Sequence, residues 1–359
     1  MSYDMIYDNQ SCNDLKTSGL LKATDMTKKK ISPPFSQTSP STVENDKSLS
    51  TSYSQQYYLK AATSDNTRKA YRSAVMQFEK WGGRLPCSES IIIGYLLDKA
   101  AVLNPRTLDL HLSAIKQWHL TQGFNNPTQS LNVSKTIEGI RRVHGKPKKK
   151  AKALRLEHIA TLLSFLLSKP ESKKKKRDIA LLLVAFFGAF RRSELVAINH
   201  EDLNWEPEGL KILLPTSKTD QLADGMYRAL PNGQAPICPV MALKEWISNA
   251  NITAGPIFRG VNRWDQLSDS AMTPGAINLW LKSLAAACEF DFTLELSSHS
   301  FRRGLSTSAA REKIAFELIK KQGGWKSDAT VWEYIEEGQE FTDNASRQLM
   351  EKMATLLSK

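Results

Sequence analysis

The segment Ser298-His-Ser-Phe-Arg-Arg-Gly304 is followed by Gln322-Gly-Gly-Trp325, and Tyr334 stands nine residues after the tryptophan. His299 and Arg302 are three residues apart, so on a helix they lie on one face and can reach a single phosphate group. A tyrosine a little further along the chain can then attack that phosphate as a nucleophile. The stretch therefore predicts a helix that presents phosphate-binding side chains, with a nucleophile close behind it.

A second arginine motif lies more than a hundred residues upstream, in Gly188-Ala-Phe-Arg-Arg-Ser-Glu-Leu195. Arg191 would complete a pair of guanidinium groups with Arg302, and guanidinium binds phosphate through two parallel hydrogen bonds. Together with Tyr334, these residues predict phosphoryl transfer to tyrosine on DNA. Each of them alone also has an ordinary interpretation, as a surface charge at a helix end or as a packed core residue.

The charge of the chain indicates an acidic partner. The formal net charge is +12, and the first 55 residues contribute nothing to it because their six acidic side chains balance six lysines. The excess sits on residues 56–359, which is typical of proteins that bind nucleic acid or an anionic membrane. A membrane is disfavoured, because no apolar run approaches the ~20 residues of a spanning helix and no signal peptide opens the chain.

The four cysteines lie far apart, and none is paired with another cysteine or a histidine at metal-binding spacing. They are Cys12, Cys87, Cys238 and Cys288. We therefore expect reduced thiols, with no disulfide framework and no zinc site. The expected location is the cytoplasm, with the nucleoid as the site of action in a prokaryote and the nucleus in a eukaryote.

The first 145 residues divide into a tail and a helical region. Residues 1–55 are rich in serine and threonine, contain several prolines and lack apolar periodicity, so they predict a disordered tail. From 56 to 145, apolar residues at helical spacing predict four short helices in an all-α domain. The clearest pattern consists of Tyr71, Ala74, Val75, Phe78 and Trp81.

Two basic runs follow this region. Residues 146–152 predict a polar linker that lies along a phosphate backbone, with solvated surface and a nuclear-import signal as alternatives. The run Lys173–Arg177 is interpreted as solvated surface between two helices. The residues expected to contact DNA are Arg141, Arg142, Lys146, Lys148, Lys149 and Lys150.

Residues 153–359 predict a mixed domain, so the expected fold class is mainly α with a small β hairpin (α+β). Helices are expected near 156–168, 178–190 and 239–250, and again from about 273 to the end. The segments 210–214 and 227–230 predict the two strands of a hairpin. The last helix has an apolar face that packs either on its own domain or on a neighbouring subunit. This face consists of Leu349, Met350, Met353, Leu356 and Leu357.

The motifs Arg191–Leu195, His299–Arg302, Gly323–Trp325 and Tyr334, in this order, resemble the tyrosine recombinase (phage integrase) family. Each motif is weak alone, but four of them in order at the family spacing make a strong signal over roughly residues 58–359. Within the family the pattern is closest to the Cre-like recombinases, which have tryptophan where most members have a second histidine. The resemblance implies a C-shaped DNA clamp, with a helical core-binding domain at 56–145 and a catalytic domain at 153–359.

The resemblance also implies roles for individual residues. Tyr334 matches the nucleophile that forms a 3′-phosphotyrosyl bond and frees a 5′-hydroxyl. Arg191 and Arg302 match the pair that binds the non-bridging phosphate oxygens. His299 matches a residue that manages the tyrosine proton or contacts the phosphate, and Trp325 would donate its indole N–H.

Two further positions follow from the resemblance. Lys218, in Pro215-Thr-Ser-Lys-Thr-Asp220, matches a mobile lysine on the hairpin turn that protonates the 5′-oxygen leaving group. Glu194, three residues after Arg191, matches an acidic residue that orients the active site. The implied chemistry needs no metal, ATP or other cofactor, because the phosphotyrosine retains the energy of the broken phosphodiester.

By the same resemblance, four subunits assemble on two double-stranded DNA sites and exchange strands through a Holliday junction, while the protein off DNA is a monomer or weakly associated. Two alternatives remain: a type IB topoisomerase-like enzyme with the same chemistry, and a catalytically inactive DNA-binding protein of this fold. The separate helical domain and the apolar C-terminal helix favour the recombinase over the topoisomerase. The inactive protein is disfavoured, because no expected catalytic position holds an inert residue.

Overall fold

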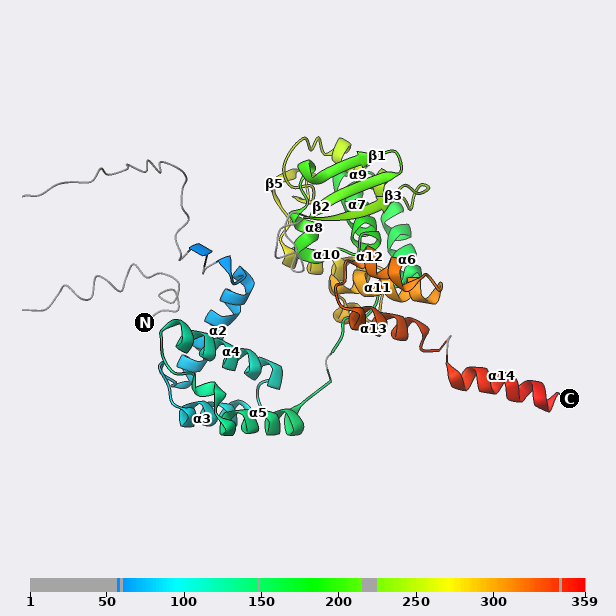
Figure 1. Ribbon diagram of the computed structural model, residues 1–359. Coiled ribbons are helices and arrows are strands. Elements are labelled where there is room, and N and C mark those ends of the chain that lie inside the picture. The colour runs from blue at the N-terminus through cyan, green and yellow to red at the C-terminus, as the bar shows by residue number, and fades with distance from the viewer. Residues whose placement is uncertain (1–56, 59–60, 148, 215–224, 342–343, 359) are drawn as a thin grey trace, which may run out of the picture. The chain divides into compact units, whose positions relative to one another are not determined.

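The computed structural model describes residues 57–58, 61–147, 149–214, 225–341 and 344–358 (Figure 1). Contacts divide the chain between Lys148 and Lys149 into two compact units, and this division falls inside the basic segment 146–152. The tail predicted at 1–55 lies outside the described residues. In the described ranges, every helix is too short or too polar to cross a membrane.

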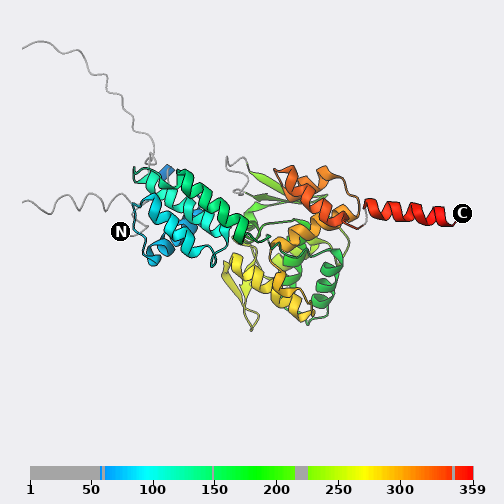
Figure 2. The ribbon, with the colours of Figure 1, turned by 90° about the horizontal axis from the view of Figure 1, so that it is seen from below.

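The first unit is a bundle of four helices: α2 (Asp65–Trp81), α3 (Glu89–Lys99), α4 (Pro105–Thr121) and α5 (Leu131–His144). α2 packs on α4, and α5 contacts both α3 and α4 (Figure 2). Three of these helices begin at a side chain whose oxygen accepts a hydrogen bond from a free backbone N–H of the first turn. Their apolar faces meet in one core, which confirms the four predicted helices. The core includes Phe78, Leu96, Leu108, Ile115 and Ile137.

The described part of the second unit contains nine helices. They are α6 (Leu156–Leu167), α7 (Lys173–Phe187), α8 (Arg192–Ala197), α9 (Pro239–Asn249), α10 (Pro274–Ala287), α11 (His299–Arg311), α12 (Phe316–Gly323), α13 (Asp328–Gln339) and α14 (Ala345–Leu357). Helices therefore dominate this unit, as the predicted fold class requires.

Two small antiparallel sheets complete the second unit. β1 (Leu203–Glu206), β2 (Gly209–Leu214) and β3 (Met226–Pro231) form one sheet in that order, which confirms the predicted hairpin of 210–214 and 227–230. β4 (Arg259–Val261) pairs with β5 (Leu267–Ala271) in the other. The sequence does not predict this second pair, because both strands are short and lack an alternating apolar pattern.

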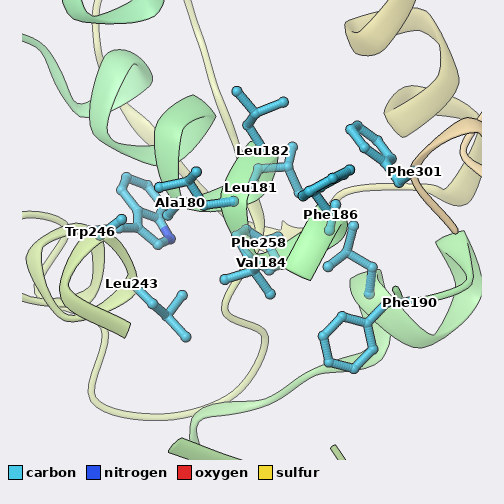
Figure 3. Close-up of a cluster of buried hydrophobic side chains, with 14 of the residues drawn as sticks. Ala180, Leu181, Leu182, Val184, Phe186, Phe190, Leu243, Trp246, Phe258 and Phe301 are labelled. Carbon is cyan, nitrogen blue, oxygen red and sulfur yellow. The ribbon is translucent and has the colours of Figure 1, made fainter. Parts of the chain in front are cut away.

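α7 is the central helix of the second unit. Its residues from Ala180 to Phe186 are all buried, so this part of the helix is apolar around its whole circumference, as expected inside a domain. α9 packs along it and adds Leu243 and Trp246 to the same core (Figure 3). Phe301 of α11 also belongs to this core, so the segment Ser298–Gly304 is attached to the scaffold of the unit.

The basic run Lys173–Arg177 is the first part of α7, so its interpretation as solvated surface between helices is wrong. The Ser172 hydroxyl and the Asp265 carboxylate accept hydrogen bonds from the first backbone N–H groups of the run. Arg177 is buried and forms an ion pair with Asp178. The carboxylates of Asp265 and Asp178 offset the unfavourable interaction of the cations with the positive end of the helix dipole. The helix predicted at 178–190 therefore begins at 173.

A glycine lets α11 approach the segment that enters the second unit. The Leu154 N–H donates a hydrogen bond to the Ser300 carbonyl of α11 at 3.0 Å. A Cβ atom at Gly304 would lie 1.7 Å from the Leu154 carbonyl oxygen, where no side chain fits. The glycine therefore permits the close contact between Leu154 and α11.

We expect Gly304→Ala to lower the free energy of unfolding by about 1–3 kcal/mol, because the added methyl group forces the Leu154 backbone away from α11. Denaturation in urea measures the change. Gly139→Ala is the control, since it adds the same group to α5 at a position with nothing within 4 Å. That variant should gain up to about 1 kcal/mol; an equal loss of stability in both variants would contradict this account.

Candidate active site

Arg302 lies in α11 and is almost completely buried, with 3% of its surface exposed. Its Nη1 donates to the Ala189 carbonyl, and its Nη2 donates to the Gly323 carbonyl at 2.9 Å. Its guanidinium carbon lies 4.7 Å from the centroid of the Trp325 ring. Arg302 thus contacts three parts of the unit: the turn that follows α7, the end of α12, and the Trp325 ring.

Arg191 is the residue before α8, and Glu194 holds it. The Arg191 N–H donates to Glu194 Oε2 at 2.9 Å, and the guanidinium forms an ion pair with the other carboxylate oxygen. Only 3% of the Glu194 side chain is exposed, whereas 19% of the Arg191 side chain is accessible. Glu194 therefore fixes Arg191 and compensates part of its charge, while the guanidinium still reaches the surface.

The chain between α7 and α8 turns at Ala189. Its φ of +47° is a left-handed conformation that residues other than glycine rarely adopt. Strained backbone of this kind persists where surrounding contacts hold it. Here the residue is fully buried, and its carbonyl accepts the hydrogen bond from Arg302. The bond from Arg302 thus helps to fix the turn that leads into Arg191.

The guanidinium groups of Arg191, Arg228 and Arg302 act on one another electrostatically. The pKa of Arg302 is lowered to about 10, first by burial and then by the charge of Arg191, while Glu194 and Tyr334 oppose the shift. Burial also lowers the pKa of Arg228. Arg302 stays charged at neutral pH, so three cations and one buried carboxylate form a positive site that favours an anion.

Tyr334 lies on α13, which packs against α11 (Figure 1). The centroid of the Tyr334 ring is 5.5 Å from that of the Trp325 ring. The Arg303 guanidinium carbon lies 5.6 Å from the centroid of the Tyr334 ring. Burial raises the pKa of Tyr334, and the nearby charges of Arg302 and Arg303 act against that shift. Tyr334, Trp325 and Arg302 therefore meet, although they come from three separate segments.

Arg303 anchors the helix that carries this tyrosine. It is buried on α11, and its Nη2 donates to the Glu337 carboxylate of α13. α11 and α13 are in close contact at Gly338, the residue after Glu337, since a Cβ atom there would lie 2.7 Å from the Thr307 carbonyl oxygen. Positions 334, 337 and 338 share one face of α13, because they are three and four residues apart. The ion pair and the close packing therefore fix the face that bears Tyr334.

The remaining predicted site residues are His299 and Lys218. His299 is the exposed first residue of α11, one turn before Arg302 on the same face. Lys218 belongs to the segment 215–224 between β2 and β3, which lies outside the described residues.

The residues predicted to contact DNA are exposed wherever the structure describes them. Arg141 and Arg142 lie in the last turn of α5, and each forms an ion pair within the first unit. Lys150 pairs with Glu333, so it is attached to α13. The others are Lys146 and Lys149, which are exposed, and Lys148, which lies outside the described residues.

Arg228 is not among the predicted site residues, although the sequence contains a signal for it. Tyr227 and Ala229 are exposed on β3, so strand alternation places Arg228 on the same face as the buried Leu230. A charged side chain on the buried face of a strand requires specific partners. Here those partners are backbone carbonyls in the Lys321–Gly323 segment.

Comparisons with known proteins show which proteins this chain is similar to. A family model described as the phage integrase family matches residues 152–340. An integrase/recombinase xerD homolog of Selenomonas ruminantium is 35% identical over 319 residues, which span 86% of this chain and 92% of that protein. Recombinase cre of Escherichia phage P1 is 24% identical over 280 residues, or 71% of this chain and 77% of that protein. The chain is thus similar to a Cre protein, as its motifs indicate, and more similar to the xerD homolog.

Among solved structures, the XerH site-specific recombinase bound to its palindromic difH substrate aligns with a TM-score of 0.55. The alignment covers 81% of this chain and 80% of that one, at 17% sequence identity. At this level of identity the similarity shows a shared fold.

We expect Arg303 and Glu337 to be energetically coupled, because either single substitution leaves a mostly buried arginine or its carboxylate without an oppositely charged partner. Glu337→Gln should lower the free energy of unfolding by about 1–3 kcal/mol, less than for a fully buried pair. A double-mutant cycle with Arg303→Met should return a coupling energy of about 1 kcal/mol or more.

The exposed pair of Arg347 and Glu351 on α14 is the control, and its coupling energy should be about 0.5 kcal/mol or less. Chemical denaturation of both sets of four proteins measures the two values. Purely additive effects at Arg303 and Glu337 would show that the ion pair does not anchor α13.

Proposed function

The chain belongs to the phage integrase family of site-specific recombinases, and we propose that it cuts and rejoins DNA strands through a covalent 3′-phosphotyrosine on Tyr334. The convergence of Tyr334, Trp325 and Arg302 in one positively charged site carries this proposal. A phosphodiester is the anion that such a site would bind on DNA, and the phenol beside it is a suitable nucleophile.

In the proposed reaction, the Tyr334 oxygen bonds to the scissile phosphorus while the bond from phosphorus to the 5′ oxygen breaks. The phenol loses its proton and the departing 5′ oxygen gains one, so the products are a 3′-phosphotyrosine and a 5′-hydroxyl. Burial raises the pKa of Tyr334, so the phenol is neutral at physiological pH and its proton must leave during the attack. By the family resemblance, His299 accepts the phenolic proton or contacts the phosphate, and Lys218 donates the proton that the leaving group gains.

Arg191 and Arg302 would stabilise the charge on the non-bridging oxygens in the transition state. Two of the five N–H groups of Arg302 already donate to carbonyls, so its guanidinium is oriented before DNA binds and further N–H groups remain for an oxygen. Donors fixed in this way need no reorganisation during the reaction. Trp325 cannot act as an acid or base, so it would contribute a hydrogen bond and its shape.

α14 supports the further proposal that subunits assemble on DNA. None of its described residues is buried, and one face consists of exposed apolar side chains. These side chains are Leu349, Met350, Met353, Leu356 and Leu357. Contiguous apolar surface of this kind marks an interaction site. Docking of α14 on the next subunit is a head-to-tail contact, which can close into a ring of four on two DNA sites and permit exchange through a Holliday junction.

We expect Tyr334→Phe to bind DNA with unchanged affinity and to form no covalent adduct, because only the nucleophilic oxygen is removed. The substrate is a duplex selected from random sequence by binding and then nicked beside the scissile phosphate, and SDS gels detect the adduct. Tyr227→Phe is the matched control, since its hydroxyl lies on an exposed residue of β3. An adduct that persists in Tyr334→Phe would place the nucleophile elsewhere.

We expect Leu349→Glu to bind a single DNA site normally but to fail in joining two sites, because the charge disrupts the docking face of α14. Native gels and analytical ultracentrifugation of the DNA complexes measure the number of subunits. Gln348→Glu places the same charge on the opposite face of the helix and should assemble normally. Full assembly by both variants would refute docking through this face, and relaxation of supercoiled DNA by a lone subunit would favour the topoisomerase-like alternative.

A further inference from the structure

Arg228 is a buried cation on β3 that pairs with no carboxylate among the described residues. Only 2% of its surface is exposed, and its neighbour across the ladder is the buried Ile212. Its Nε has no hydrogen-bond acceptor in the described structure. Removing a guanidinium from water is costly unless other hydrogen bonds replace those to water. The hydrogen bonds of its Nη groups therefore have to compensate the loss of water around Arg228.

Among the described residues, the oxygen atoms that accept hydrogen bonds from Arg228 belong to the end of α12. Its Nη1 donates to the carbonyls of Lys321, at 3.1 Å, and Gln322, and its Nη2 lies 3.4 Å from the Gly323 carbonyl oxygen. The last carbonyls of a helix have no partner within the helix and carry the negative end of its dipole. A cation is therefore favourable here, and Arg228 caps α12 from a distant strand.

The fit between β3 and the end of α12 is tight. Gly324 ends the helix with a φ of +61°, and a Cβ atom there would lie 2.7 Å from Arg228 Nη2. The left-handed backbone at 324 therefore favours glycine, and a side chain there would have to displace the Arg228 guanidinium. The Gln322 side-chain amide also donates to the carbonyl of Ala229 at 3.2 Å. Two adjacent residues of β3 thus hold the segment 321–323.

The Gly323 carbonyl connects this cap to the active site. Its oxygen accepts from Nη2 of Arg302 at 2.9 Å as well as from Arg228, and a carbonyl oxygen has two lone pairs for two donors. Gly323 also packs on Trp325, because a Cβ atom at 323 would lie 1.5 Å from the indole ring. A rotation of the Gly323 peptide would therefore displace both Arg302 and Trp325.

We propose, building on the function proposed above, that Arg228 is a positioning residue for phosphoryl transfer, which fixes the Gly323 carbonyl and through it Arg302 and Trp325. Arg228 does not contact the phosphate in this proposal, because its Nη groups are engaged by carbonyls and the side chain is buried beneath them. Its effect on the reaction is transmitted by the geometry of Arg302.

The test compares Arg228→Met and Arg228→Lys with the wild-type protein on two nicked substrates. One has a normal scissile phosphodiester, and the other has a methylphosphonate, in which a methyl group replaces one non-bridging oxygen and makes the reacting centre neutral. Because the neutral centre needs less stabilisation by guanidinium, a defect transmitted through Arg302 should shrink on the methylphosphonate. Arg302→Ala gives the reference pattern, and Lys211→Met is the matched control because it removes an exposed cation from the neighbouring strand.

On the phosphodiester, we expect Arg228→Met to form the Tyr334 adduct about 10–10²-fold more slowly, as for a small misplacement of a catalytic group, with unchanged DNA affinity. The defect should fall to within about threefold on the methylphosphonate, as for Arg302→Ala. Arg228→Lys keeps the charge but loses the planar fork, so its defect should be smaller and follow the same pattern. Lys211→Met should react at the wild-type rate.

Circular dichroism and thermal unfolding check the fold of each variant, and Arg228→Lys decides alone if Arg228→Met does not fold. A wild-type rate on the phosphodiester would overturn the positioning role. A defect of equal size on both substrates would also overturn it, because general loosening of the fold would then be the cause. If the wild-type protein forms no adduct at Tyr334, the proposed function fails and this role fails with it; an active wild type with unaffected Arg228 variants rejects the positioning role alone.

Discussion

The second unit depends on a charged side chain buried where three segments meet. Arg302 satisfies the carbonyl of Ala189, which sits in a strained turn, and the carbonyl of Gly323, which ends a helix and has no partner within it. Each of these groups is unfavourable in isolation, since an unsatisfied buried polar group costs about 1–3 kcal/mol. Together they satisfy one another. The same hydrogen bonds orient the guanidinium. The contacts that stabilise the fold at Arg302 are therefore also the contacts that position it in the site.

The parts of the fold that the sequence predicts are those set by local periodicity. The four helices of the first unit follow from apolar spacing such as Tyr71, Ala74 and Phe78, and the β2–β3 hairpin follows from two short apolar segments. The start of α7 does not follow, because a run of cations at a helix N-terminus is unfavourable until Asp265 approaches from far along the chain. The sequence does not predict the sheet of β4 and β5, because both strands are short and their residues are mostly polar or small.

In the site, too, the residues that local spacing predicts differ from those that only tertiary contacts determine. His299 and Arg302 are predictable together because one helical turn separates them, and the motif spacing selects Trp325 and Tyr334. The residues that position these groups, Arg303 and Arg228, are harder to predict, because only the tertiary fold brings their partners close to them. Glu337, the partner of Arg303, lies on another helix, and the partners of Arg228 are backbone carbonyls that no sequence motif marks. A buried charge on an alternating strand is the one local signal that Arg228 gives.

The balance of charge explains why this arrangement suits a phosphate. Arg191, Arg228 and Arg302 repel one another, and Glu194 is the carboxylate that moderates them. Two further carboxylates would make the site neutral, and it would then attract an anion only weakly. Without Glu194 the cations would lack a partner and Arg191 would lack its anchor. The cluster is therefore left with an excess of positive charge that an anionic phosphate can complete. A bound anion would offset the repulsion among the three guanidinium groups, and this favours the binding of a phosphate at the site.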